Sequence, residues 1–188
     1  MVILGMFIYK ETVRPKDSDN PADEMFSMAN YDVVSSTATE YEGYLNEGDN
    51  YRYDHIPPMQ EGDLLRLIRV SLRWTDEPDI ADGHTQYDNE PDRFYLVLKW
   101  QSQAPGDDTV LIGSAAGQNL YDGEGLIQFH ILLTHYSADS TDGMGAWNVT
   151  VHMVSAGDHI HPSEKIPNQP DDGNAYQLNV EVEIYRPK

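Results

Sequence analysis

Apolar residues recur at every second position along most of the chain, which is the period of a strand with one buried face. Near the C-terminus, Tyr176 and Ile184 bound a run in which Leu178, Val180 and Val182 alternate with polar residues. A helix would scatter these five side chains around its circumference, so the pattern predicts a strand. The same alternation occurs at residues 68–74, 94–100, 127–133 and 147–153. On this pattern, Trp74, Trp100 and Trp147 belong to the core.

Turn-forming sequences separate these strands. Weaker strands fit residues 31–45 and 50–56, and Gly48 between them allows the positive φ that a tight turn often needs. Residues that favour turns also fill 76–92, 104–108, 121–125, 139–145 and 167–174. No segment has the period of a long amphipathic helix. About eight strands, each with one wet face, predict an all-β fold, an antiparallel β-sandwich of jelly-roll type.

The first thirty-two residues differ from the rest of the chain. Residues 1–9, MVILGMFIY, are apolar but too few to span a bilayer. Three interpretations remain: the end of a membrane anchor that begins upstream, an ordinary first strand, or a strand donated to a neighbouring subunit. Residues 10–32 hold two prolines and mixed charge, which predicts a linker. We expect one β-sandwich domain at residues 33–188.

The charge of the chain limits its partners. Twelve Lys and Arg against thirty-two Asp and Glu give a net charge of 12 − 32 = −20, so nucleic acid would be repelled. The acidic residues are spread along the chain, as in the solvated surfaces of halophilic proteins. The absence of cysteine excludes disulfides, thiolate metal sites and cysteine nucleophiles.

The longest acidic loop is a candidate calcium site. Calcium takes six to eight oxygen ligands from carboxylates, carbonyls and water, and loops between strands supply them well. The spacing differs from that of an EF-hand, and a solvated acidic loop is the alternative in so acidic a chain. The candidate ligands are Asp76, Glu77, Asp79, Asp82, Asp88, Asn89 and Asp92. Glu90 lies in the same loop and offers a further carboxylate.

Two histidine pairs are candidate sites for a transition metal. His130 and His152 both lie on the polar phase of their strands, so their rings would face one another if those strands paired. His159 and His161 are two residues apart beside Asp158, a set that suits zinc, copper or nickel. The alternative is that they are surface histidines, since the His-Glu-x-x-His motif is absent.

Tyrosines are the remaining signal. Tyr41, Tyr44, Tyr51 and Tyr53 surround one turn, where they serve either core packing or a contact surface for protein or glycan. Other tyrosines near loops or strands are Tyr87, Tyr95, Tyr121 and Tyr136. Asn148 begins an Asn-Val-Thr glycosylation sequon, but its place in a strand argues against modification.

Several short motifs resemble the jelly-roll accessory domains of secreted proteases, namely the bacterial and archaeal pre-peptidase C-terminal domain and the P domain of proprotein convertases. In that family a G-x-L-x-E-G-D hairpin precedes a strand ending in L-x-W-x-D, and a later strand begins with Asn-Asp-Leu-Asp. The matching residues here are Gly43, Leu45, Glu47, Gly48, Asp49, Leu72, Trp74 and Asp76, and, in a loosened form of the last element, Asn89, Pro91, Asp92, Phe94 and Leu96. The resemblance implies a non-catalytic module outside the cell, sometimes with calcium bound.

No nucleophile elbow or phosphate-binding glycine loop occurs in the sequence. The favoured hypothesis is therefore a non-enzymatic extracellular or cell-surface module that acts in binding or assembly. Two alternatives stay open. One is a subunit of an extracellular filament or capsid-like assembly that uses the N-terminal apolar segment as a donated strand. The other is a carbohydrate-binding or glycoside-active protein.

Overall fold

The computed structural model describes residues 30–36, 38–75, 81–82, 85–86, 88–102, 109–118, 123–132, 145–163 and 167–188. These residues form fourteen strands. No helix in the described part of the chain is long and apolar enough to cross a membrane. Residues 1–29, which include the apolar N-terminal segment and most of the expected linker, lie outside the described residues.

Eight long strands pair in a nested order. The first of them pairs with the last (β2 with β14), the second with the seventh (β3 with β11), the third with the sixth (β4 with β10), and the fourth with the fifth (β8 with β9), all antiparallel. This nesting is the winding of a jelly roll and confirms the predicted fold. The strands are β2 Thr39–Asn46, β3 Asn50–His55, β4 Leu64–Thr75, β8 Arg93–Ser102, β9 Thr109–Gln118, β10 Glu124–Leu132, β11 Gly145–Ser155 and β14 Gly173–Pro187.

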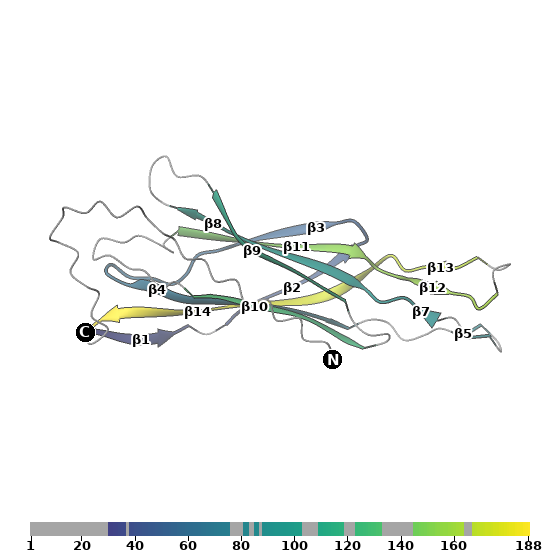
Figure 1. Ribbon diagram of the computed structural model, residues 1–188, viewed down its shortest axis with the longest axis horizontal. Coiled ribbons are helices and arrows are strands. Elements are labelled where there is room, and N and C mark those ends of the chain that lie inside the picture. Colours follow the sequence, from purple (N-terminus) through teal and green to yellow (C-terminus); the bar gives the residue numbers. More distant parts are fainter. Residues whose placement is uncertain are drawn as a thin grey trace, which may run out of the picture.

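Rolling up the nested pairs produces two packed sheets (Figure 1). In the first sheet, β14 lies between β4 and a side shared by β1 and β2, and β10 forms the other edge. The second sheet has the order β3-β11-β8-β9. The remaining strands are short: β1 Tyr31–Ser35, β5 Ala81–Asp82, β6 Thr85–Gln86, β7 Asp88–Asn89, β12 Asp158–Ile160 and β13 Gln169–Pro170. Four of them, β5, β7, β12 and β13, extend beyond the sandwich at one end (Figure 1).

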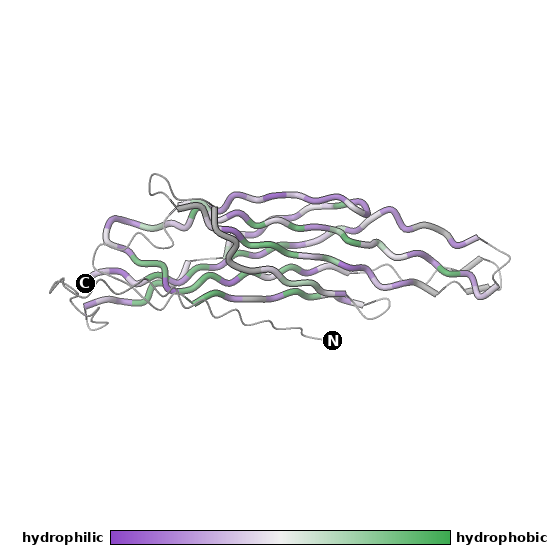
Figure 2. Tube along the Cα trace, turned by 45° about the horizontal axis from the view of Figure 1, so that its top comes forward, coloured by the Kyte–Doolittle hydropathy of each residue, from purple (hydrophilic) through white to green (hydrophobic). Residues whose placement is uncertain are grey.

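The core lies between the inner faces of the two sheets. The alternating apolar residues predicted in β4, β11 and β14 are buried there, which confirms these three strands. Figure 2 shows the same alternation of hydrophobic and hydrophilic positions along the strands. Trp74 and Trp147 are buried, and Trp100 is half-buried and stacks on Trp147 with ring centroids 6.1 Å apart.

Two local features differ in detail from the sequence pattern. β1 starts at Tyr31 and pairs with the end of β14, so the first sheet includes the last two residues of the expected linker. The turn at Gly48 has the expected positive φ of 81°, but it does not close a hairpin. It carries the chain from one sheet to the other, since β2 pairs with β14 while β3 pairs with β11. The backbone N–H of Gly48 donates to the carbonyl of Met153 in β11, and the N–H of Met153 donates to the carbonyl of Asp49, so both bonds hold the turn against the second sheet.

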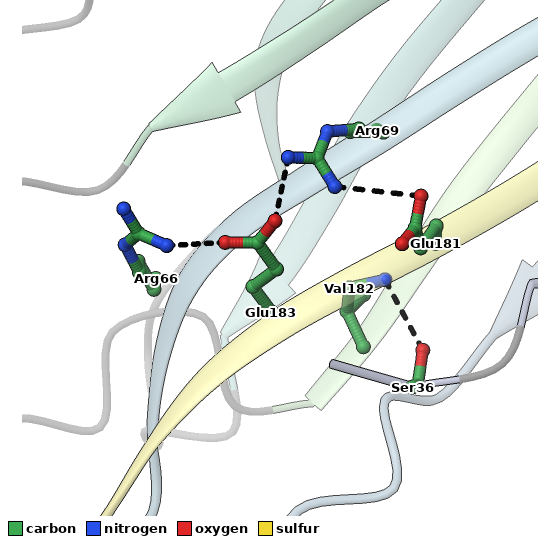
Figure 3. A network of polar contacts seen from close by, with 6 residues as sticks. All are labelled: Ser36, Arg66, Arg69, Glu181, Val182 and Glu183. Atoms are coloured by element: carbon green, nitrogen blue, oxygen red, sulfur yellow. Dashed lines mark hydrogen bonds and ion pairs between the residues drawn. The ribbon is translucent and has the colours of Figure 1, made fainter. Parts of the chain in front are cut away.

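Arginines of β4 and glutamates of β14 form a row on the outer face of the first sheet (Figure 3). Glu183 accepts from both Arg66 and Arg69, and Arg69 also contacts Glu181 at 3.4 Å. These pairs follow from the register, which places Arg69 opposite Glu181. Exposed ion pairs each contribute little to stability. Glu183 is mostly buried under its two partners, so we expect its ion pairs to contribute more than exposed ones do.

Asp63 and Arg186 tie the start of β4 to the end of β14. Asp63 is 2% exposed, and Arg186 donates to both of its oxygens, at 3.0 and 2.8 Å. The backbone N–H of Gln60 also donates to the carboxylate, at 2.8 Å. The bond from Arg186, together with that of Gln60, holds the pKa of Asp63 below its ordinary value despite burial.

Replacing Asp63 should reveal this pair as a pH-dependent stabilisation. A folded pKa below the unfolded value means that the stabilisation is present above about pH 4 and is lost as the pH falls through the folded pKa. We expect Asp63→Asn to lower the free energy of unfolding by about 1–3 kcal/mol at pH 7. In urea denaturation the gap to the wild type should narrow below about pH 4.

The matched control is Asp32→Asn, which removes a carboxylate from an exposed ion pair with Lys188. It should change the stability by less than about 0.5 kcal/mol. A difference in the free energy of unfolding between Asp63→Asn and wild type that stays constant from pH 7 to pH 3 would contradict a stabilising role of the ionised Asp63.

Gly125 makes room for the ring of Trp74. The two residues are opposite each other in the β10–β4 register, and a Cβ on Gly125 would lie 2.0 Å from an atom of that ring. We expect Gly125→Ala to cost about 1–3 kcal/mol, because a packed core cannot absorb the added methyl group without moving. Gln128→Ala, at an exposed position of the same strand, should be nearly neutral. Equal urea midpoints for the two variants would refute this packing argument.

Candidate functional site

The candidate calcium ligands fall into three groups in the structure. Asp76, Glu77 and Asp79 lie outside the described residues. Asp82, Asp88 and Asn89 belong to the short strands β5 and β7, of which only the backbone is described. The backbone of β7 pairs with β12, which places Asn89 opposite His159. Among the described residues, no cluster of three or more His, Asp or Glu could hold a metal ion. Calcium binding by this loop therefore stays a prediction.

Asp92 is the one candidate ligand whose side chain is described, and it lies in the interior at 0% exposure. Asn174 of β14 donates to its carboxylate and also to the backbone carbonyl of Thr75, at 2.7 Å. Through Asn174, Asp92 thus joins the start of β8 to the start of β14 and the end of β4. A buried carboxylate requires such a donor, so this contact gives Asp92 a structural role beside any role in calcium binding.

The two histidine pairs do not form the arrangements expected from the sequence. His130 and His152 cannot face one another, because β10 lies in the first sheet and β11 in the second, with both histidines on outer faces. His159 and His161 are buried rather than on the surface. Nδ1 of His161 accepts from the backbone N–H of Ser163 at 2.9 Å. Asn148 is also buried, at 4% exposure, so its sequon is inaccessible in the folded domain.

A row of aromatic rings runs from the core to the surface between β2 and β3. We call Tyr41, Tyr51 and Tyr53 the tyrosine flank. The ring of Tyr53 contacts both others in tilted arrangements, with its centroid 4.6 Å from that of Tyr41 and 4.7 Å from that of Tyr51. Its hydroxyl lies 2.8 Å from that of Tyr176, whose ring in turn contacts Phe94 in the core. Tyr53 is partly buried and packs against the core, which confirms the packing role, whereas Tyr51 is 55% exposed and its role as a contact surface stays a prediction.

Burial changes the acidity of groups around the tyrosine flank. Desolvation raises the pKa of Tyr176 and of Tyr41, so both phenols stay neutral and can act as hydrogen-bond donors. Nδ1 of His55 lies 3.2 Å from the hydroxyl of Tyr41, and burial lowers the pKa of this histidine. The flank therefore carries no charge on its inner side at neutral pH.

The two strands beside the flank have different free edges. Within the described residues, β2 pairs only with β14 and β3 only with β11, so each is a sheet edge. The hydroxyl of Tyr53 donates to the backbone carbonyl of Glu42 at 3.4 Å, which partly covers the edge of β2. The edge of β3 instead carries Arg52 and Asp54, whose side chains are 58% and 59% exposed and pair with each other at 2.9 Å. An exposed edge strand is a template for pairing with another strand.

A shallow groove of about 660 Å³ crosses one end of the first sheet. Its lining comes from four strands, β2, β14, β4 and β10. Arg73 of β4 lies within it, opposite Gln177 of β14 and Leu126 of β10. The amide of Gln177 donates to Glu42 at 3.3 Å. The groove thus combines one cation with amide and carboxylate groups.

Neither Arg73 nor the edge of β3 was predicted from the sequence. The alternation of polar residues in β4 placed Arg73 on the wet face, but only the register shows that the neutral Gln177 of β14 lies opposite it. The self-complementary Arg52 and Asp54 are visible in the sequence, yet their value depends on β3 being an edge.

Comparisons with known proteins give a fold-level likeness at most. No protein-family model matches the sequence, and no curated protein matches it either. Solved structures of VP1 from Trichodysplasia spinulosa-associated polyomavirus are similar. VP1 in complex with GM1 oligosaccharide is 8% identical, with a TM-score of 0.32 over 80% of this chain and 96% of that one. VP1 in complex with sialylated precision glycooligomers is 9% identical, with a TM-score of 0.31 over 84% and 100%. The nested strand pairing itself identifies this chain as a jelly-roll β-sandwich, and membership of the pre-peptidase or P-domain family is not shown.

Calcium binding to the acidic loop can be tested by thermal unfolding. A calcium ion that binds only the folded state raises the melting temperature by mass action. At a free calcium concentration of one hundred times the dissociation constant, the free energy of unfolding rises by about 2.7 kcal/mol. We expect a higher melting temperature with calcium than with a chelator at matched ionic strength, and loss of the difference in Asp76→Asn/Asp79→Asn. Superimposed melting curves for the wild type would show that the loop is merely solvated.

Proposed function

We propose that this protein is a non-catalytic subunit of an extracellular or cell-surface assembly, and that two copies contact each other through the edge of β3. The observation that carries the proposal is the exposed edge of β3 beside the tyrosine flank. An edge strand offers unpaired backbone groups, and exposed tyrosines bring apolar area with few rotatable bonds. The combination suits contact with another protein chain.

The tyrosine flank supports this role because it is rigid before any partner arrives. Tyr51 rests on Tyr53, and Tyr53 is fixed by its hydroxyl contact with Tyr176. Ordering a mobile side chain at an interface costs about 0.5–1.5 kcal/mol, and a ring already held by its neighbours avoids most of this. Ile56, directly after β3, adds a further exposed apolar side chain.

The side chains of β3 favour a second copy as the partner. In an antiparallel pair of β3 strands centred on Tyr53, Arg52 of each copy lies opposite Asp54 of the other. Tyr51 then lies opposite His55, and the two Tyr53 residues face each other. A twofold axis makes both charge contacts at once, as in the self-complementary interfaces of symmetric dimers. The second sheets of the two copies would join into one continuous sheet.

The net charge sets the medium in which this contact forms. Two chains of charge −20 repel each other, and this repulsion is screened within about 3 Å at 1 M salt. The edge itself is locally neutral, because Arg52 and Asp54 balance. The proposed setting of the assembly is a salty medium outside the cell, and screening of the net charge supports the salty medium.

Analytical ultracentrifugation across a range of salt concentrations tests the proposal. The wild type should self-associate, more tightly at about 2 M than at about 0.2 M sodium chloride, as repulsion is screened. Asp54→Arg places arginines opposite each other and should raise the dissociation constant at least about tenfold, since like charges directly opposite destabilise a strand pair. The double variant Arg52→Asp/Asp54→Arg restores the pairing and should recover the wild-type constant.

Tyrosine variants separate the flank from other exposed surfaces. Tyr51→Ser should weaken association at least about tenfold, whereas Tyr44→Ser, at 57% exposure on the outer face of the first sheet, should not. A wild type that stays monomeric at every salt concentration would overturn the proposal. So would an Asp54→Arg variant that associates like the wild type.

A further inference from the structure

We infer that the groove around Arg73 binds a carboxylated saccharide, a role separate from the contact proposed for β3. The groove lies on the outer face of the first sheet, where exposed residues of four strands line it. Its volume of about 660 Å³ falls within the range of small-molecule sites, about 300–1,000 Å³.

Arg73 differs from the other arginines of β4. Arg66 and Arg69 pair with glutamates of β14, but the register places the neutral Gln177 opposite Arg73. No hydrogen bond or ion pair engages the exposed guanidinium of Arg73 in the described structure. An unengaged guanidinium can bind a carboxylate through two parallel hydrogen bonds.

The acidic residues of the groove restrict the charge of the ligand. Glu42 and Glu124 line the same groove as Arg73, so a polyanion or a doubly charged phosphate would meet repulsion. A ligand with one carboxylate and several hydroxyls avoids this, because glutamates accept hydrogen bonds from hydroxyls. The hydroxyl of Thr75 and the amide of Gln177 add groups that both donate and accept.

Tyr44 gives the groove an aromatic neighbour. It lies opposite Ala175, a residue of the groove lining, and its ring is exposed on the same outer face. A sugar ring has an apolar face that can stack on an aromatic ring while its hydroxyls reach polar groups. One cation, several hydroxyl partners and an adjacent ring together define an acidic monosaccharide or a short glycan that ends in one.

Titration with 3′-sialyllactose, lactose and acetate tests this inference. Chemical shifts of backbone amides should change for residues of β4 and β14 around the groove with 3′-sialyllactose. Lactose lacks the carboxylate and acetate lacks the hydroxyls, so each should bind at least about tenfold more weakly. Equal affinity for lactose would overturn the role of the carboxylate, and equal affinity for acetate would reduce the groove to a simple anion site. No shift at about 10 mM 3′-sialyllactose, equivalent to a binding free energy weaker than about −3 kcal/mol, would overturn the inference.

Arginine variants locate the site. Arg73→Gln should weaken 3′-sialyllactose binding at least about tenfold. Arg73→Lys keeps the charge but loses the bidentate geometry, so its affinity should lie between those of the wild type and Arg73→Gln. Arg93→Gln is the matched control, since Arg93 is also exposed and engages no group among the described residues, but lies on the second sheet. Wild-type affinity in Arg73→Gln would refute the assignment. Binding that survives in Tyr51→Ser, with association unchanged in Arg73→Gln, separates this site from the proposed interface.

Discussion

The backbone pairing of β14 is the constraint on which the rest of the structure depends. This single strand hydrogen-bonds to β1, β2 and β4, so it closes the first sheet and joins both described ends of the chain to the middle. Its inner residues must then be apolar, because they face the second sheet across the core. Its outer residues are left to carry charge, and they meet arginines of β4 in register.

The excess of acid makes the placement of each basic residue consequential. Three of the twelve basic residues of the chain lie on β4, where two of them neutralise glutamates of the adjacent strand. A carboxylate as buried as that of Glu183 or Asp63 needs a cationic or hydrogen-bonding partner, since an unpaired buried charge is costly. Among the described residues, Arg73 pairs with no such carboxylate. This distinction, drawn from the register, separates structural arginines from one that remains open to a ligand.

The sequence predicted those features that depend on one strand at a time. Alternation alone identified the buried residues of β4, β11 and β14, because the position of a residue along its strand decides which face of the sheet its side chain is on. Features that depend on two strands were missed or wrong. The turn at Gly48 has the same local chemistry whether it closes a hairpin or crosses between sheets, and His130 and His152 have the same polar phase in either sheet. The acidic loop was readable as a charge pattern, but its ligand geometry requires positions that no pattern supplies.

Two surfaces of different character follow from the same winding. The crossing at Gly48 places β2 and β3 at the edges of opposite sheets, so the inward residues of both strands meet in the tyrosine flank rather than within a single sheet. Tyr53 uses this position to cover the edge of β2 with its hydroxyl, which leaves β3 as the open edge. The groove instead lies on the solvent-exposed face of the first sheet, because the alternation of side chains directs the apolar residues to the opposite face. An interface at β3 would extend the second sheet sideways and leave the outer face of the first sheet accessible. Self-association and the binding of a small ligand in the groove would therefore not compete for the same surface.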